Sequence, residues 1–173
     1  MGLLEFWYEF SSTYSYPAAM RIERLAEHAG VEVVWRPFLL GPIFKAQGIH
    51  DSPFNIFAAK GRYMWRDLAR TCEAGEADGW TPAFSRVVFA ANYAEQKDIS
   101  EDATLGAILR ALGVDAEAAL AEANAPPIKE RLKDQTAEAA ARGLFGAPSF
   151  TLGDELFWGN DRLEAALAFA KRG

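Results

Sequence analysis

A proline stands at the entrance to an apolar segment near the end of the chain, and a helix start follows soon after it. The sequence Phe145-Gly146-Ala147-Pro148-Ser149-Phe150 is typical of a turn that leads into a strand. Gly153-Asp154 predicts the tip of a hairpin, and Gly159-Asn160-Asp161 predicts the start of a helix. Residues 144–173 are therefore expected to form strand, hairpin and helix.

The composition indicates a globular chain of moderate size. Its 173 residues are enough for one domain with a sizeable core, or for one domain that carries an insertion. The net charge of −6 argues against non-specific binding of nucleic acid. No apolar run is long enough to span a bilayer. Residues 1–10 contain Glu5 and Glu9 and lack a basic start, so we expect no signal peptide and a cytoplasmic location.

The cysteine and histidine content excludes some kinds of site. Cys72 is the single cysteine, so the chain can form neither an internal disulfide nor a C-x-x-C redox site. A lone cysteine in a helical pattern is most often a small buried hydrophobe. His28, His50 and the acidic residues show no spacing typical of metal ligands, and no metal is expected.

The chain opens with a strand–helix–strand pattern. Residues 3–10 alternate and are rich in aromatic side chains, which predicts a buried strand, and residues 11–16 form a turn rich in hydroxyl groups. A helix is predicted over 17–28 and is ended by Gly30; its apolar stripe consists of Ala18, Ile22, Leu25 and Ala29. Residues 31–37 form a second strand. This order implies a parallel pair joined by a right-handed crossover.

A long helical block follows the second strand. After a loop through Pro53, residues up to 143 are predicted to be almost wholly helical. One helix includes residues 63–68, and others cover 83–95, 115–125 and 127–143. The helix at 83–95 has an apolar side formed by Phe84, Val87, Val88 and Ala91. Ser100, followed by two acids, resembles an N-cap. The apolar face of the last helix is predicted to consist of Leu163, Ala166, Leu167 and Ala170.

The order of these elements indicates an α/β fold. A βαβ unit, a helical block and a final ββα unit resemble a thioredoxin-like domain interrupted by a helical insertion domain. The predicted thioredoxin-like domain comprises residues 1–40 and 144–173, and the inserted helical domain comprises residues 41–143.

The hydroxyl-rich turn is the first candidate for chemistry. Ser12 lies where the first strand passes into the first helix, and a helix N-terminus presents unpaired N–H groups and positive potential. A hydroxyl there could donate a hydrogen bond to a thiolate that belongs to a ligand, and so lower the pKa of the ligand's thiol. The alternative is that Ser12 is an ordinary cap or turn residue.

The C-terminal segment supplies the second half of a site. By frequency alone the bond before Pro148 would be trans. A cis bond would turn the N–H and C=O of Ala147 toward the pocket, where they could pair with an extended peptide ligand. Asn160 or Asp161 is either an ordinary N-cap or part of a pocket for a zwitterionic amino-acid end.

These segments together resemble the glutathione-dependent branch of the thioredoxin superfamily, within the wider group that includes DsbA. The chain looks most like the 2-hydroxychromene-2-carboxylate isomerases, with the kappa-class glutathione transferases as close relatives. The family's opening pattern is matched by Trp7-Tyr8-Glu9-Phe10-Ser11-Ser12-Thr13-Tyr14-Ser15-Tyr16, in which Thr13 replaces the usual proline. Residues 36–38, 44–48, 62–68 and 145–163 also fit.

The resemblance implies roles for particular residues. Ser12 would assist the glutathione sulfur, and Ala147, at the bond to Pro148, would pair with the glutathione backbone. The γ-glutamyl pocket would be formed by Trp158, Gly159, Asn160 and Asp161. Lys45 would contact the substrate carboxylate and Asn55 would be a further substrate contact, although Lys45 could equally be an exposed surface lysine. Lys60 and Arg62 could face ligand carboxylates or simply be solvated.

Two departures from the family pattern affect the substrate side. Ile49 stands where relatives often carry Asn, so a polar contact is expected to be lost there. Between residues 71 and 80 the chain is expected to be shorter than the family, which has a further loop and helix start. Either this segment is deleted, or the protein carries residues there that this sequence omits; omission is favoured, because cutting a helix in a packed insertion should expose apolar surface.

The implied function is that of a glutathione-dependent isomerase in the catabolism of aromatic compounds. It would interconvert 2-hydroxychromene-2-carboxylate and an open-chain 2-oxo acid of the hydroxybenzylidenepyruvate type. Its expected partners are glutathione and a small aromatic 2-oxo acid, with no nucleic acid or membrane, and a homodimer is left open. Two alternatives are a kappa-class-like transferase that conjugates glutathione to electrophiles, and a non-catalytic thioredoxin-like binding module.

Overall fold

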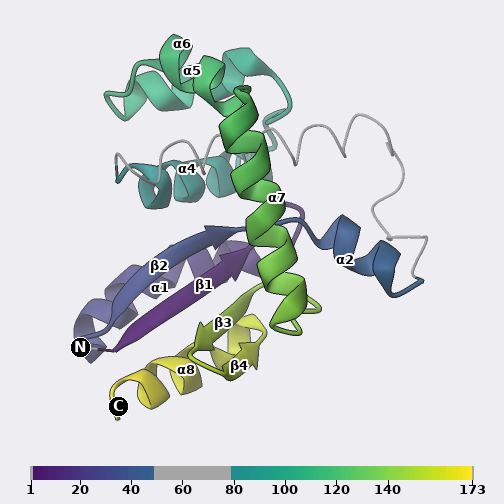
Figure 1. Cartoon of the computed structure of the whole chain (residues 1–173). Coiled ribbons are helices and arrows are strands. Elements are labelled where there is room, and N and C mark those ends of the chain that lie inside the picture. The colour runs from purple at the N-terminus through teal and green to yellow at the C-terminus, as the bar shows by residue number, and fades with distance from the viewer. Residues whose placement is uncertain (1, 49–78, 173) are drawn as a thin grey trace.

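A mixed four-stranded sheet is the centre of the fold (Figure 1). The structure, a computed structural model, describes residues 2–48 and 79–172. The strands lie in the order β2-β1-β3-β4, and their bounds are β1 (Leu3–Tyr8), β2 (Glu32–Pro37), β3 (Ser149–Leu152) and β4 (Glu155–Trp158). β1 and β2 are parallel, whereas β3 is antiparallel to both β1 and β4. The expected thioredoxin-like α/β class is confirmed, and so is the hairpin tip at Gly153-Asp154.

Both faces of β1 are buried because helices cover the sheet on each side. α1 (Ser15–Ala29) joins β1 to β2 and contacts α8 (Leu163–Ala170), which also contacts β1 and β3. Alternate residues of β1, among them Phe6 and Tyr8, belong to the core cluster that these helices share. Trp7 points to the opposite face, where it joins a second cluster with Phe38 and Ala139. The near-continuous apolar run of β1 follows from this double coverage.

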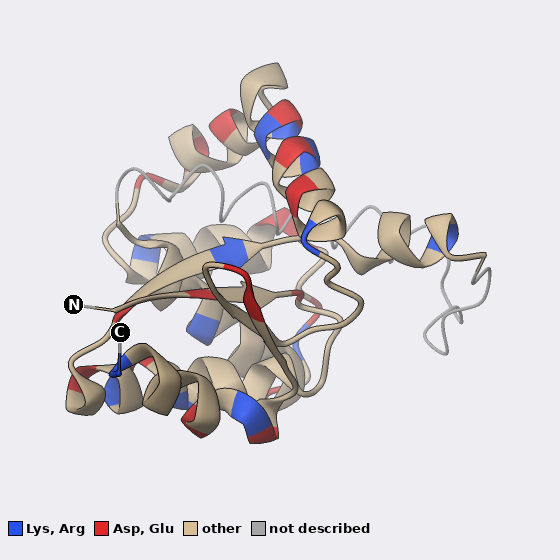
Figure 2. Cartoon of the chain, turned by 60° about the horizontal axis from the view of Figure 1, so that its bottom comes forward, with Lys and Arg blue, Asp and Glu red and all other residues tan. Residues whose placement is uncertain are grey.

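The remaining helices lie between β2 and β3 in the sequence. They are α2 (Leu40–Ala46), α4 (Thr81–Tyr93), α5 (Asp102–Ala111), α6 (Ala116–Ala123) and α7 (Pro126–Ala141). α7 contacts β2 and α2, and acidic and basic residues stand side by side along it (Figure 2). Among the helices that the structure describes, none is both long and apolar enough to cross a membrane. The division into domains after residues 40 and 143 stays a prediction.

Several boundaries differ from the sequence prediction. Residues 40–46 form a helix where a loop was expected, and α1 begins at Ser15, so that Pro17 still lies in its first turn. Gly30 ends α1 as predicted, with a left-handed φ of 70°. Ser100 does not cap α5: Glu101 is the N-cap residue, and the N–H and hydroxyl of Ser100 both donate to the carboxylate of Asp98.

The predicted helix faces are largely correct. Ala18 and Ile22 of α1 are buried, and so are the four predicted residues of α8, whereas Leu25 and Ala29 are only partly buried. In α4, Val87 is exposed, while the other three residues of its predicted face are buried. Val87 lies one position before Val88, so it lies about 100° around the helix from it and faces solvent.

A charged cluster ties α7 to the sheet. The carboxylate of Glu5 on β1 accepts hydrogen bonds from Arg36 on β2, from Arg142 just after α7, and from Thr151 on β3. Both guanidinium groups also lie over the Trp7 ring, 5.8 and 5.6 Å from its centroid. Burial raises the pKa of Glu5, but the hydrogen bond from Thr151 and the charges of the two arginines outweigh it and leave this pKa lowered.

Candidate functional site

The two halves of the predicted site meet through a hydrogen bond. Ser12 Oγ donates to the carbonyl oxygen of Ala147 over 2.6 Å, across 135 residues of sequence. The same Ser12 oxygen accepts the N–H of Ser15 at the start of α1, at 3.3 Å. The Ala147-Pro148 bond is cis. In the described part of the chain the N–H of Ala147 has no hydrogen-bond acceptor, so it can pair with a ligand.

This arrangement refines the role predicted for Ser12. The Ser12 hydroxyl already donates its hydrogen bond to the Ala147 carbonyl oxygen. To donate to a ligand's sulfur, the hydroxyl must therefore rotate away from that carbonyl. The Ser15 N–H would remain directed at the Ser12 oxygen during the exchange. Ser12 is therefore both a turn residue, as the alternative interpretation held, and a donor beside the ligand-binding backbone.

The buried carboxyl group of Glu9 connects the turn that contains Ser12 to the start of α2. Glu9 accepts the hydroxyl proton of Ser11 at 2.6 Å and the N–H of Leu40, the first residue of α2, at 3.1 Å. The carbonyl of Glu9 accepts the N–H of Ser12. Both donors to the carboxyl group are neutral, and burial raises its pKa to about 7. Glu9 thus fixes the turn and the start of α2 relative to each other.

α4 reaches the same turn. Tyr93 donates its hydroxyl proton to the carbonyl of Phe10 over 2.9 Å. Burial and then the negative charge of Glu9 raise the pKa of Tyr93 to about 12, so this phenol remains a donor at neutral pH.

An aromatic pair lies beside the cis-proline loop. The rings of Phe145 and Trp158 have centroids 4.9 Å apart, and both side chains are substantially exposed. A Cβ atom at Gly146 would lie 2.3 Å from Trp158 Nε1. Glycine is therefore required for the indole to pack against this loop.

The predicted γ-glutamyl turn is joined directly to the cis-proline loop. Gly159, with φ of 106°, donates its N–H to the carbonyl of Pro148 over 2.9 Å. Asn160 and Asp161 follow in a short 3-10 turn, η2 (Asn160–Arg162), before α8. Neither caps a helix with its side chain. Asp161 is exposed, and the carboxamide of Asn160 is held by Arg21 of α1.

Lys45 stands apart from these contacts. It lies exposed in the last turn of α2 and forms no ion pair with another described residue. Its predicted contact with a substrate carboxylate stays a prediction. Asn55, Ile49, Lys60, Arg62, Cys72 and His50 lie outside the described residues.

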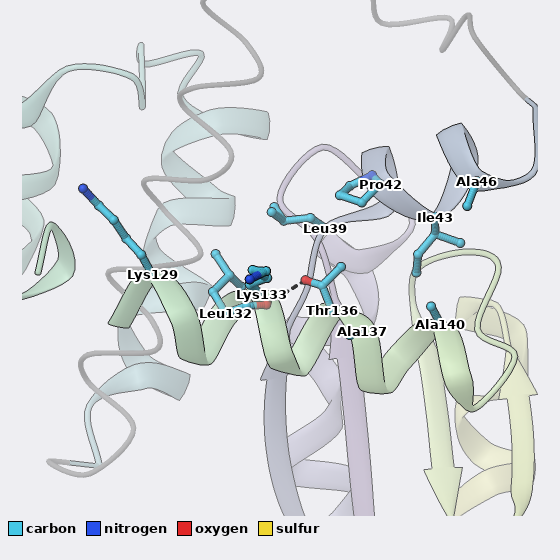
Figure 3. Close-up of a pocket in the computed structure, with 10 residues that line it drawn as sticks. All are labelled: Leu39, Pro42, Ile43, Ala46, Lys129, Leu132, Lys133, Thr136, Ala137 and Ala140. Carbon is cyan, nitrogen blue, oxygen red and sulfur yellow. Dashed lines mark hydrogen bonds between the residues drawn. The ribbon is translucent and has the colours of Figure 1, made fainter. Parts of the chain in front are cut away.

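A cavity of about 470 Å³ lies between α2 and α7 (Figure 3). Pro42 and Ile43 of α2 face Leu132 and Thr136 of α7 across it, and the side chains around it are mainly apolar. None of the predicted site residues in the described ranges lines this cavity. Within those ranges no group of histidine, cysteine or acidic side chains could hold a metal ion.

Two residues at the site escaped the sequence prediction. For Arg21 the sequence predicts only a place in the helix over 17–28. Its contact with Asn160 joins residues 139 positions apart, and no local pattern shows such a contact. Glu9 was read only as the acid of the opening pattern, although an acid within an apolar strand signals a buried partner. The structure brings together Ser12, Ala147 and the turn from 158 to 161, and no contact within the described residues joins Lys45 to them.

Comparison with known proteins agrees with this geometry. A family model described as a DSBA-like thioredoxin domain matches residues 3–169. The chain is 27% identical over 183 residues to the 2-hydroxychromene-2-carboxylate isomerase of Sphingobium xenophagum, covering 93% of this chain and 94% of that protein. It is 26% identical to the isomerase of the same name from Pseudomonas putida, over 93% and 90%. The resemblance to these isomerases is confirmed.

The solved structures show the same fold. A structure of 2-hydroxychromene-2-carboxylate isomerase matches with a TM-score of 0.83 and 25% identity over 98% of this chain and 95% of that chain. A probable DsbA oxidoreductase from Streptomyces coelicolor matches with a TM-score of 0.74 and 21% identity, over 98% and 90%. The alignment to the Sphingobium enzyme runs over more residues than this chain contains, so that relative carries residues that are absent here. From residue 3 to residue 169 the chain belongs to the family of DSBA-like thioredoxin domains.

Proposed function

We propose that this chain is a glutathione-dependent isomerase that interconverts 2-hydroxychromene-2-carboxylate and an open-chain hydroxybenzylidenepyruvate-type 2-oxo acid. Similarity to isomerases of that name, over nearly the whole of both chains, supports an isomerase. The observation that carries the proposal is the contact between Ser12 and Ala147, because it puts a hydroxyl donor next to a backbone edge that can pair with a peptide.

The residues present suit a thiol peptide. The Ala147 N–H has no acceptor in the described part of the chain, and Ser12 supplies a hydroxyl at the start of α1. The hydrogen bond from Gly159 to Pro148 puts the polar turn at Asn160 and Asp161 next along the same edge. A backbone contact, a hydroxyl donor and a polar end turn are what an extended peptide such as glutathione requires.

The chemistry of the proposal divides between the bound peptide and the chain. When bound, the glutathione thiol supplies a nucleophile that adds reversibly to an unsaturated carbon, so that rotation takes place about a single bond. Ser12 and the N-terminus of α1 would stabilise negative charge on the sulfur. Lys45 would neutralise the substrate carboxylate. A cytoplasmic location and a homodimer also remain predictions.

The product of the reaction tests the proposal. The protein would be incubated with 2-hydroxychromene-2-carboxylate and glutathione. The products would be separated by liquid chromatography, which resolves isomers of equal mass, and identified by their ultraviolet spectra and their masses. We expect an isomer of unchanged mass and no consumption of glutathione. A stable conjugate would instead indicate a kappa-class-like transferase. An unchanged substrate, with glutathione bound or unbound in calorimetry, would indicate a non-catalytic module.

A further inference from the structure

Arg21 of α1 reaches across to the turn that precedes α8. Its Nη2 lies 3.1 Å from Asn160 Oδ1 and 3.4 Å from the Asn160 carbonyl oxygen. Its Nη1 forms an ion pair with Glu164 at 2.8 Å. One guanidinium group therefore holds both the backbone and the side chain of Asn160.

This contact fixes the orientation of the Asn160 carboxamide. A guanidinium group only donates hydrogen bonds, so the atom of the carboxamide that faces Arg21 must be its oxygen. The NH₂ group then points away from Arg21, and within the described residues it donates to no protein acceptor. Asn160 is thus held as a hydrogen-bond donor beside the cis-proline loop.

The neighbouring residue offers the opposite chemistry. The Asp161 carboxylate is 73% exposed, and its ion pair with Arg162 is long, at 3.5 Å. Such an exposed pair contributes little, so the carboxylate can take another cation. A donor followed at once by a carboxylate complements the carboxylate and ammonium groups of an α-amino acid.

We propose that Arg21 is a positioning residue for recognition of the α-amino-acid end of the ligand. Arg21 orients the Asn160 NH₂ group toward the ligand's α-carboxylate, while Asp161 binds the α-ammonium group. This inference rests on the proposed function, because it takes glutathione as the ligand and its γ-glutamyl residue as the recognised end.

The test compares two ligands in titration calorimetry. Glutathione carries the γ-glutamyl end, and cysteinylglycine is the same peptide without it. Arg21→Met is expected to weaken glutathione binding about tenfold or more, as expected when a hydrogen bond to a charged group is lost. Cysteinylglycine binding should not change. The loss should appear as a raised KM for glutathione and not as a lower kcat, because saturating glutathione fills the weakened site and Arg21 is not proposed to contact the sulfur.

Two further variants separate positioning from a purely structural role. Glu164→Gln removes the ion pair of Arg21 but leaves its contact with Asn160, so glutathione binding should be unchanged. Asn160→Ala should weaken glutathione binding, and adding Arg21→Met to it should weaken binding no further.

Three results would overturn the inference. They are unchanged glutathione affinity in Arg21→Met, equal weakening for both ligands, and equal weakening in Arg21→Met and Glu164→Gln. Each of these results counts against the inference alone when the wild-type protein binds glutathione. If the wild-type protein does not bind glutathione, the proposed function itself fails. Glutathione binding by the wild type therefore distinguishes the two failures.

Discussion

At the scale of single residues, Ser12 connects the two ends of the chain. Its oxygen accepts a hydrogen bond from the Ser15 N–H, and its hydroxyl donates a hydrogen bond to the Ala147 carbonyl. The residue therefore has both a structural and a proposed chemical role. A useful variant must separate binding of glutathione from turnover, since only the second depends on a donor to the sulfur.

Ser12→Ala is expected to leave glutathione bound but to lower kcat about 100-fold, the usual cost of removing one donor to a developing charge. Steady-state kinetics and calorimetry on the same preparation would measure both quantities. Thr13→Ala is the matched control, because it removes the neighbouring exposed hydroxyl and should leave the rate unchanged. An undiminished rate in Ser12→Ala would refute the role given to this residue.

Gly146→Ala is expected to displace the Trp158 indole, since the added methyl group would lie 2.3 Å from Nε1. Because the indole is about half exposed and can move into solvent, we expect a loss of under about 1 kcal/mol in unfolding free energy and a shift in tryptophan fluorescence. Gly41→Ala is the control, because nothing lies within 4 Å of that position. If both variants behave alike, Gly146 is not required for packing of the indole.

At the scale of elements, two buried acids join the sheet to the helices: Glu5 on β1 and Glu9 in the turn after it. Their surroundings shift their pKa values in opposite directions. Glu5 lies between two guanidinium groups that join β1, β2 and the end of α7, and its pKa is lowered. Glu9 has only neutral donors, from the Ser11 hydroxyl and the first N–H of α2, and its pKa is raised. The pH dependence of stability should therefore differ in sign between the two.

Glu5 should stabilise the fold at neutral pH and lose that effect in acid. Its native pKa lies below 4.5, so the unfolded chain takes up the proton first as the pH falls, and stability declines as pH falls from 4.5 through the native pKa. Glu5→Gln should cost about 3 kcal/mol at pH 7 and should remove this acid dependence in denaturant unfolding. Glu138→Gln, which alters an exposed ion pair with Arg142, should cost under about 1 kcal/mol. Equal losses in the two variants would contradict this account.

Glu9 should have the reverse effect. Its pKa of about 7 in the fold exceeds the ordinary value of 4.5, so the native state binds more protons than the unfolded state between these limits. Stability should fall by about 3 kcal/mol as the pH rises from 4.5 to 7 because of this group alone. Glu9→Gln should abolish that fall in urea titrations at several pH values. A wild-type slope retained in the variant would show that Glu9 does not titrate in this range.

At the scale of the whole molecule, local patterns predicted the elements well and long-range contacts poorly. The aromatic-rich apolar run of β1, Gly30 after α1 and the turn at Gly153-Asp154 each act within a few residues, so the sequence shows them directly. Residues 40–46 lie in the segment predicted as a loop, although they form α2; Gly41-Pro42, a pair typical of turns, lies inside this helix. The helix forms with its first N–H bound by Glu9, a residue 31 positions earlier.

The candidate site shows the same division. A short motif marks Ser12 and another marks Ala147, and the resemblance to a family pairs the two residues, which are in hydrogen-bond contact in the structure. The contact of Arg21 with Asn160 has no local signature, because it depends on how α1 and η2 meet in space. Sequence reasoning therefore found the residues at the ends of elements and missed those that act between elements.

The dependence of turnover on glutathione tests the central claim most directly. The initial rate of 2-hydroxychromene-2-carboxylate isomerisation would be measured with purified protein over a range of glutathione concentrations, including none. The account predicts no enzymatic rate without glutathione and a rate that rises to saturation as glutathione is added. Full turnover in its absence, or no turnover at any concentration, would contradict the account.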